Sequence, residues 1–153
     1  MIHRLVLVAA ALASVAATCS RGEVPRLSQP EYEHQVKTLY AGIQSAFQGT
    51  RGVSGVELAN KVALAQAALR EAADALETTR PPLEVESDNR ALAAAMREYA
   101  DALDQARQAA ATGDRAGLAP FENAAALKAV QDMAEAAERM KHKGYDLGPL
   151  TKD

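Results

Sequence analysis

Two histidines and two glutamates have the types and spacing for metal chemistry. Glu31 and His34 are three positions apart near the start of one expected helix, and Glu138 and His142 are four positions apart near the end of another. Either spacing places both side chains on one face of a helix. Imidazole and carboxylate together suit Zn²⁺ or Cu²⁺. The alternative is structural, with Glu31 in a helix cap and His142 as a cation at a helix C-terminus.

Cys19 is the only cysteine, and it follows an apolar run. Arg4 and the apolar segment Leu5–Ala17 are typical of a secretory signal, and the segment is shorter than the ~20 residues of a membrane-spanning helix. The small residues before Cys19 resemble the lipobox of bacterial lipoproteins, although Thr18 stands where Gly, Ala or Ser is usual. We therefore predict that Cys19 is lipidated. The alternative is ordinary signal peptidase cleavage after Ala17, which leaves Cys19 as a free thiol.

These signals divide the chain into four parts. We expect a signal peptide over residues 1–18, a tether over 19–28, a helical domain over 29–148 and a tail over 149–153. Lipidation of Cys19 would hold the domain at the extracytoplasmic face of the cell membrane. Without it, the protein would be secreted or periplasmic. The expected partners are the membrane, through the lipid anchor, and another protein of the cell envelope.

Composition excludes several classes of function. The formal net charge is −3, and it becomes one unit more negative when Arg4 leaves with the leader, so no basic stripe predicts binding to nucleic acid. A single cysteine rules out covalent haem of the Cys-x-x-Cys-His type, and one Glu-x-x-His motif is too few for a di-iron bundle. No phosphate loop, nucleophile elbow or zinc-protease motif occurs. We therefore expect no cofactor and no catalytic activity.

Caps and apolar periodicity predict four helices. Ser28 with Glu31, and Ser54 with Glu57, are capping boxes that begin the first two helices. The third is expected to begin at Ser87 or Asp88, and the fourth at Asp114. Pro120 is expected either in the first turn of the main part of the fourth helix or at a kink in an early part of it. Apolar residues then recur every three or four positions. The expected faces are Tyr32, Val36, Leu39, Ile43 and Phe47; Leu58, Val62, Ala65, Leu69, Ala72 and Leu76; Leu92, Met96, Tyr99, Leu103, Ala106 and Ala110; and Phe121, Leu127, Val130, Ala134 and Ala137.

Helices of this length with short connections predict an all-α fold, an up-down-up-down four-helix bundle. In that topology the first helix begins at the same end at which the fourth helix ends, so His34, His142, Glu31 and Glu138 would gather there. Facing alanines let helices approach to ~8 Å, which predicts little room for a ligand in the core. Charges four positions apart, such as Arg70–Asp74, Arg97–Asp101 and Glu135–Arg139, predict charge pairs on a solvated face.

Four segments occur in the order EYEHQV, ALETTRPPLEVESDNRAL, ATGDRAGLAPF and KHKGYDLG. In these segments the chain resembles a group of uncharacterised exported helical proteins of actinobacteria. These share a lipoprotein-like leader, a Pro-Pro linker between the middle helices and a Lys-Gly-Tyr-Asp ending. The resemblance covers nearly the whole mature chain and implies export and a helical fold. Its motifs are caps and linkers, so it implies no activity.

The sequence as a whole favours an exported, lipid-anchored helical bundle that acts at the cell envelope by binding or spacing. A second hypothesis is a metal-binding or metal-delivery protein that uses His34 and His142. An enzyme is the third and least favoured class.

Overall fold

The computed structural model describes residues 25–124 and 127–151, and this part of the chain is all-helical. The predicted signal peptide and Cys19 lie outside the described residues. Within the described ranges no helix is long and apolar enough to span a membrane. The α-helices are α1 (Gln29–Gln48), α2 (Gly55–Thr78), α3 (Glu86–Thr112), α4 (Arg115–Glu122) and α5 (Lys128–His142), with 3-10 turns η1 (Leu83–Val85) and η3 (Gly148–Leu150).

Local signals set the helix ends. The backbone N–H and the hydroxyl of Ser28 both donate to the Glu31 carboxylate, at 2.8 and 2.6 Å, which closes the first turn of α1. Helices α3 and α5 are each followed by a glycine with left-handed backbone, Gly113 at φ 73° and Gly144 at φ 90°. Other residues rarely adopt this conformation, so glycine ends both helices efficiently.

Helix α3 is the centre of the packing. It contacts α2, α4 and α5, whereas α1 packs mainly on α2. All six residues of the predicted apolar face of α3 are buried, and so is the predicted face of α2 except Leu58. Burial of these faces supplies most of the stabilisation, because the driving force scales with apolar area removed from water.

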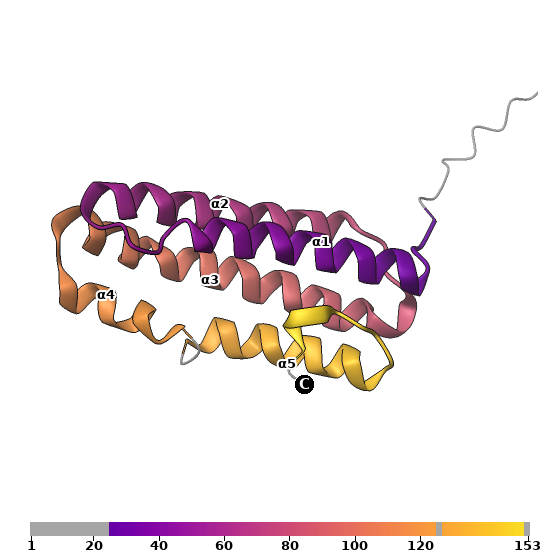
Figure 1. The fold of residues 1–153 in the computed structure, drawn as a ribbon. Coiled ribbons are helices and arrows are strands. Elements are labelled where there is room, and N and C mark those ends of the chain that lie inside the picture. Colours follow the sequence, from indigo (N-terminus) through magenta and orange to yellow (C-terminus); the bar gives the residue numbers. More distant parts are fainter. Residues whose placement is uncertain (1–24, 125–126, 152–153) are drawn as a thin grey trace, which may run out of the picture.

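The predicted fourth helix is divided in two. Helix α4 contains Pro120 and ends two residues later, and α5 begins at Lys128. Figure 1 shows α4 and α5 one after the other along α3. Proline removes a backbone donor and clashes with the preceding turn, so a continuous helix through Pro120 is costly. Along the predicted face, Phe121, Val130 and Ala134 are only half-buried.

Both ends of the predicted domain make contacts beyond residues 29–148. The Leu27 N–H donates to the Arg80 carbonyl at 2.8 Å. The Arg26 guanidinium donates to the Pro81 carbonyl and pairs with Glu86, each at 2.9 Å. At the other end, Leu150 packs against the core.

The predicted charge pairs are solvent-exposed, but Arg70 and Arg97 pair with the neighbouring helix and not within their own. Arg70 pairs with Asp101 at 2.9 Å, and Arg97 pairs with Asp74 and Glu77, so these bridges join α2 to α3. The two helices lie against each other, which brings their flanking charges together. The bridges are exposed, so each contributes at most ~1 kcal/mol.

Candidate functional site

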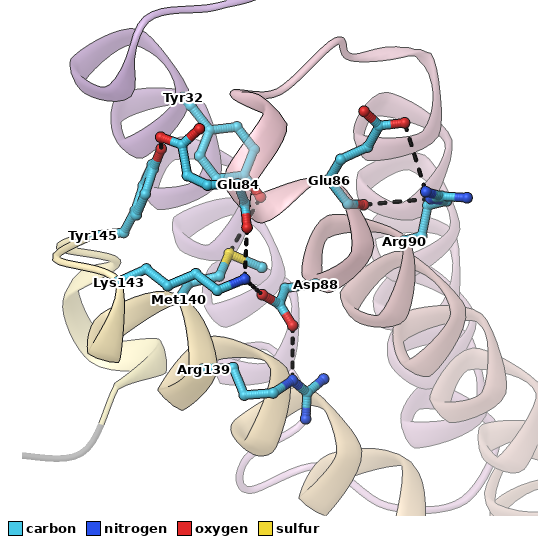
Figure 2. A network of polar contacts seen from close by, with 9 residues as sticks. All are labelled: Tyr32, Glu84, Glu86, Asp88, Arg90, Arg139, Met140, Lys143 and Tyr145. Carbon is cyan, nitrogen blue, oxygen red and sulfur yellow. Dashed lines mark hydrogen bonds and ion pairs between the residues drawn. The ribbon is translucent and has the colours of Figure 1, made fainter.

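A cluster of polar side chains fastens the end of α5 to the start of α3 (Figure 2). The Asp88 side chain is 6% exposed, and its carboxylate accepts hydrogen bonds from Arg139 Nε and Lys143 Nζ, each at 2.7 Å. Lys143 also donates to the backbone carbonyl of Glu84. Figure 2 shows the Lys143 ammonium between these two acceptors.

Two opposing effects set the pKa of Asp88. Burial raises it, while the hydrogen bonds and positive charges of Lys143 and Arg139 lower it. The second effect is the larger in total, and the pKa of Asp88 lies below its usual value. Asp88 is therefore ionised at neutral pH, as the ion pairs require.

Two tyrosines complete the cluster. The Tyr145 hydroxyl donates to Glu84 Oε1 at 2.6 Å, and the Tyr32 hydroxyl donates to Asn89 Oδ1 at 3.0 Å. The rings of Tyr32 and Tyr145 meet edge to face, with centroids 5.9 Å apart. Burial raises the pKa of both hydroxyls, so both remain protonated donors. The Asn89 side chain donates in turn to the Leu76 carbonyl at 2.8 Å.

The polar groups of the cluster form hydrogen bonds with one another. Across the described ranges every buried side-chain nitrogen and oxygen has a hydrogen-bond partner. The contacts of Arg139, Lys143 and Tyr145 with Asp88 and Glu84 join the C-terminal segment to the start of α3.

A second feature is an apolar cleft beside α1, made of three adjoining hollows, two of which lie between α1 and α5. Both helices line the cleft, and in the described part of the chain they make few direct contacts with each other. The central hollow has a volume of about 430 Å³. Its apolar walls come from α1, α3 and α5, namely Ile43, Phe47, Met96, Tyr99, Val130 and Met133.

The other two hollows adjoin the central one. The α5 hollow, about 530 Å³, shares Tyr40, Val130 and Met133 with it and continues to Leu150. The α4 hollow, about 260 Å³, shares Phe47 and Tyr99 with it and reaches α4 at Leu118 and Phe121. The central and α5 hollows have volumes within the range of small-molecule sites, ~300–1,000 Å³.

The cleft is open to the surface and lies beside the closely packed core, in which little room for a ligand was expected. Alanines do bring α2 and α3 together, with Ala65, Ala72 and Ala106 buried. Along the cleft, however, the facing residues are large. Phe47 stacks on Tyr99 with ring centroids 5.6 Å apart and planes at 5°, and Met133 lies on the α5 side. Methionine side chains adapt readily to an irregular apolar ligand.

The mouth of the central hollow is polar. Gln44, Gln48, Thr50 and Arg51 line it near the end of α1, and Gln44, Gln48 and Arg51 are exposed. Apolar walls with a few polar groups at the entrance are typical of ligand sites. Such a site binds and orients a molecule, and the cleft is therefore the candidate functional site.

The four candidate metal ligands do not form one group. Glu138 and His142 line the α5 hollow, whereas Glu31 is held by Ser28, whose hydrogen bonds lower the pKa of its carboxyl. His34 is exposed and is not among the residues of that hollow. In the part of the chain that the structure describes, no group of three or more His, Cys, Asp or Glu residues could hold a metal ion. The geometry therefore gives the metal hypothesis no support.

Comparison with known proteins finds no matching family model, no similar curated protein and no similar solved structure. The fold and the site define an all-helical protein with an apolar cleft along α5 and a polar cluster that fastens its C-terminal segment.

Proposed function

We propose that this is an exported, lipid-anchored protein of the cell envelope that binds a ligand non-catalytically in the apolar cleft beside α1. The observation that carries the proposal is the cleft, whose apolar walls adjoin a polar mouth. The leader and Cys19 support export and anchoring, and the resemblance to exported actinobacterial proteins agrees with both. Such a protein would take up or present a molecule close to the membrane.

The proposal includes an up-down-up-down bundle in which α4 and α5 together replace the fourth helix. Their order along α3 supports this arrangement (Figure 1). A fourth element in two pieces leaves α1 without a closely packed partner on the α5 side. The break between α4 and α5 would in this way be the origin of the cleft.

The first prediction concerns the anchor. In a bacterial host that processes lipoproteins, the wild-type chain should incorporate a labelled fatty acid and partition into detergent, and Cys19→Ser should do neither. Each buried acyl CH₂ contributes ~0.8 kcal/mol, so two chains anchor firmly. Thr18→Ala is the matched control and should still be labelled, because it supplies the usual small residue. Mass spectrometry that finds an unmodified N-terminus at Thr18 would refute the anchor.

The second prediction concerns the cleft. The fluorescent probe 8-anilinonaphthalene-1-sulfonate should bind the wild-type protein, and Met133→Trp should weaken its binding about tenfold or more, because the indole fills space shared by the central and α5 hollows. Val130→Phe obstructs the same space and should also weaken probe binding. Leu64→Trp is the control, since Leu64 is 59% exposed on α2, outside the cleft.

Circular dichroism establishes that each variant is folded. Equal probe binding by the wild type, Met133→Trp and Val130→Phe would mean that the probe binds elsewhere, and would refute the cleft as the binding site.

A further inference from the structure

The cleft offers a long apolar path. The central and α5 hollows share Val130 and Met133, and the α5 hollow continues to His142. The twelve-residue step from Val130 to His142 corresponds to ~18 Å along α5, at 1.5 Å per residue. A path of this length along one helix suits a flexible chain better than a compact ring system.

Charge distinguishes the two ends of this path. Arg51 is the one charged residue among the described residues that line the central hollow, although the chain as a whole has a net charge of −3. Its guanidinium has no hydrogen-bond or ion-pair partner in the described part of the chain. The α5 hollow instead has two acidic residues, Glu135 and Glu138, beside Arg139 and His142.

The neighbourhood of Arg51 adds to its attraction for an anion. The amides of Gln44 and Gln48 line the same mouth and supply further hydrogen-bond donors. A guanidinium and two amides favour a carboxylate or a similar small anion.

We infer that the cleft binds a single-chain anionic amphiphile of the fatty-acid class. Its head group lies at Arg51, and its chain extends past Met133 along α5 towards Leu150. This inference rests on the proposed function and adds the chemical class of the ligand. The stacked pair of Phe47 and Tyr99, which lines both the central and the α4 hollow, forms a rigid wall beside the head-group end.

The test uses laurate, titrated into the purified protein by calorimetry and also used to displace the anilinonaphthalene probe. Laurate should bind at one site, and dodecyltrimethylammonium, which has the same chain with a cationic head, should bind at least about tenfold more weakly. Decanoate and octanoate should each bind about tenfold more weakly than the next longer chain. This follows from ~0.8 kcal/mol for each of two methylenes, at 1.4 kcal/mol per tenfold.

Arg51→Gln should weaken laurate binding about three- to fivefold, because the site is exposed to solvent, and should strengthen the binding of dodecyltrimethylammonium, because it removes a like charge. Arg115→Gln, an exposed arginine of α4 that does not line the hollows, is the matched control and should have no effect. Met133→Trp should abolish laurate binding. Circular dichroism again establishes that each variant is folded.

The outcomes separate the ligand class from the proposed function. Probe binding that depends on Met133 but resists displacement by laurate would overturn the fatty-acid class and leave the cleft as the binding site. Equal affinity for laurate and the cationic amphiphile would overturn the role of Arg51 and with it the anionic head group. Probe binding that is independent of Met133 would overturn the proposed function itself.

Discussion

Leu92→Ala is expected to lower the free energy of unfolding by ~2–5 kcal/mol. Leu92 is 0% exposed and belongs to the core cluster, on the helix that contacts α2, α4 and α5. Truncation removes buried methyl groups and leaves a cavity that neighbouring helices can only partly fill. Because small domains are stable by only ~5–15 kcal/mol in total, the loss should be visible in the midpoint of urea denaturation followed by circular dichroism.

The matched control is the same substitution on the surface. Leu64 lies on α2 and is 59% exposed, so Leu64→Ala should change the unfolding free energy by no more than ~0.5 kcal/mol. Losses of similar size in the two variants would contradict the packing of α3 described above.

The buried apolar faces of α2 and α3 could be predicted because the sequence patterns that mark them are local. A 4-3-4 spacing of apolar residues defines one face of a helix whatever lies opposite, and the interaction of Ser28 with Glu31 spans a single turn. Most of the residues so chosen are buried in the structure. The all-α fold was therefore accessible from the sequence.

The division of the fourth helix was less accessible. Pro120 marks a disturbance, but the alanines that follow it favour a helix by intrinsic propensity. The start of α5 at Lys128 depends on how the chain returns to α3, and no short window of sequence carries that information.

The cleft and the polar cluster were missed for a related reason. The width of the cleft depends on how far α3 holds α5 from α1, which is a relation among three helices. The sequence marked Asp88 only as a possible start of the third helix, whereas its partners Arg139 and Lys143 are 51 and 55 positions away. The Lys-Gly-Tyr-Asp ending was the available hint, since it includes Lys143 and Tyr145.

Asp88→Asn is expected to lower the free energy of unfolding by ~1–3 kcal/mol at neutral pH. The substitution keeps the shape of the side chain but removes the charge that holds Arg139 and Lys143. The loss is moderate because both cations are partly exposed and regain water. Hydrogen exchange should show faster opening of the segment from Lys143 to Leu150, which the cluster fastens. Asp101→Asn, at a carboxylate 73% exposed, is the control and should cost at most ~1 kcal/mol.

Acid should remove the difference between the wild type and Asp88→Asn. The pKa of Asp88 is lowered in the folded protein, so its ionised form contributes stability that is fully present above the usual aspartate pKa of 3.8. That contribution is lost as the pH falls through the lower pKa of the folded protein.

Urea denaturation at about pH 7 should therefore show different free energies of unfolding for the two proteins, and the difference should shrink steadily below about pH 4. Carboxylates outside the polar cluster whose pKa is lowered, among them Glu31 and Asp104, destabilise both proteins alike in acid and leave this difference unaffected. A separation that stays constant as the pH falls would mean that the charge of Asp88 does not fasten the C-terminal segment.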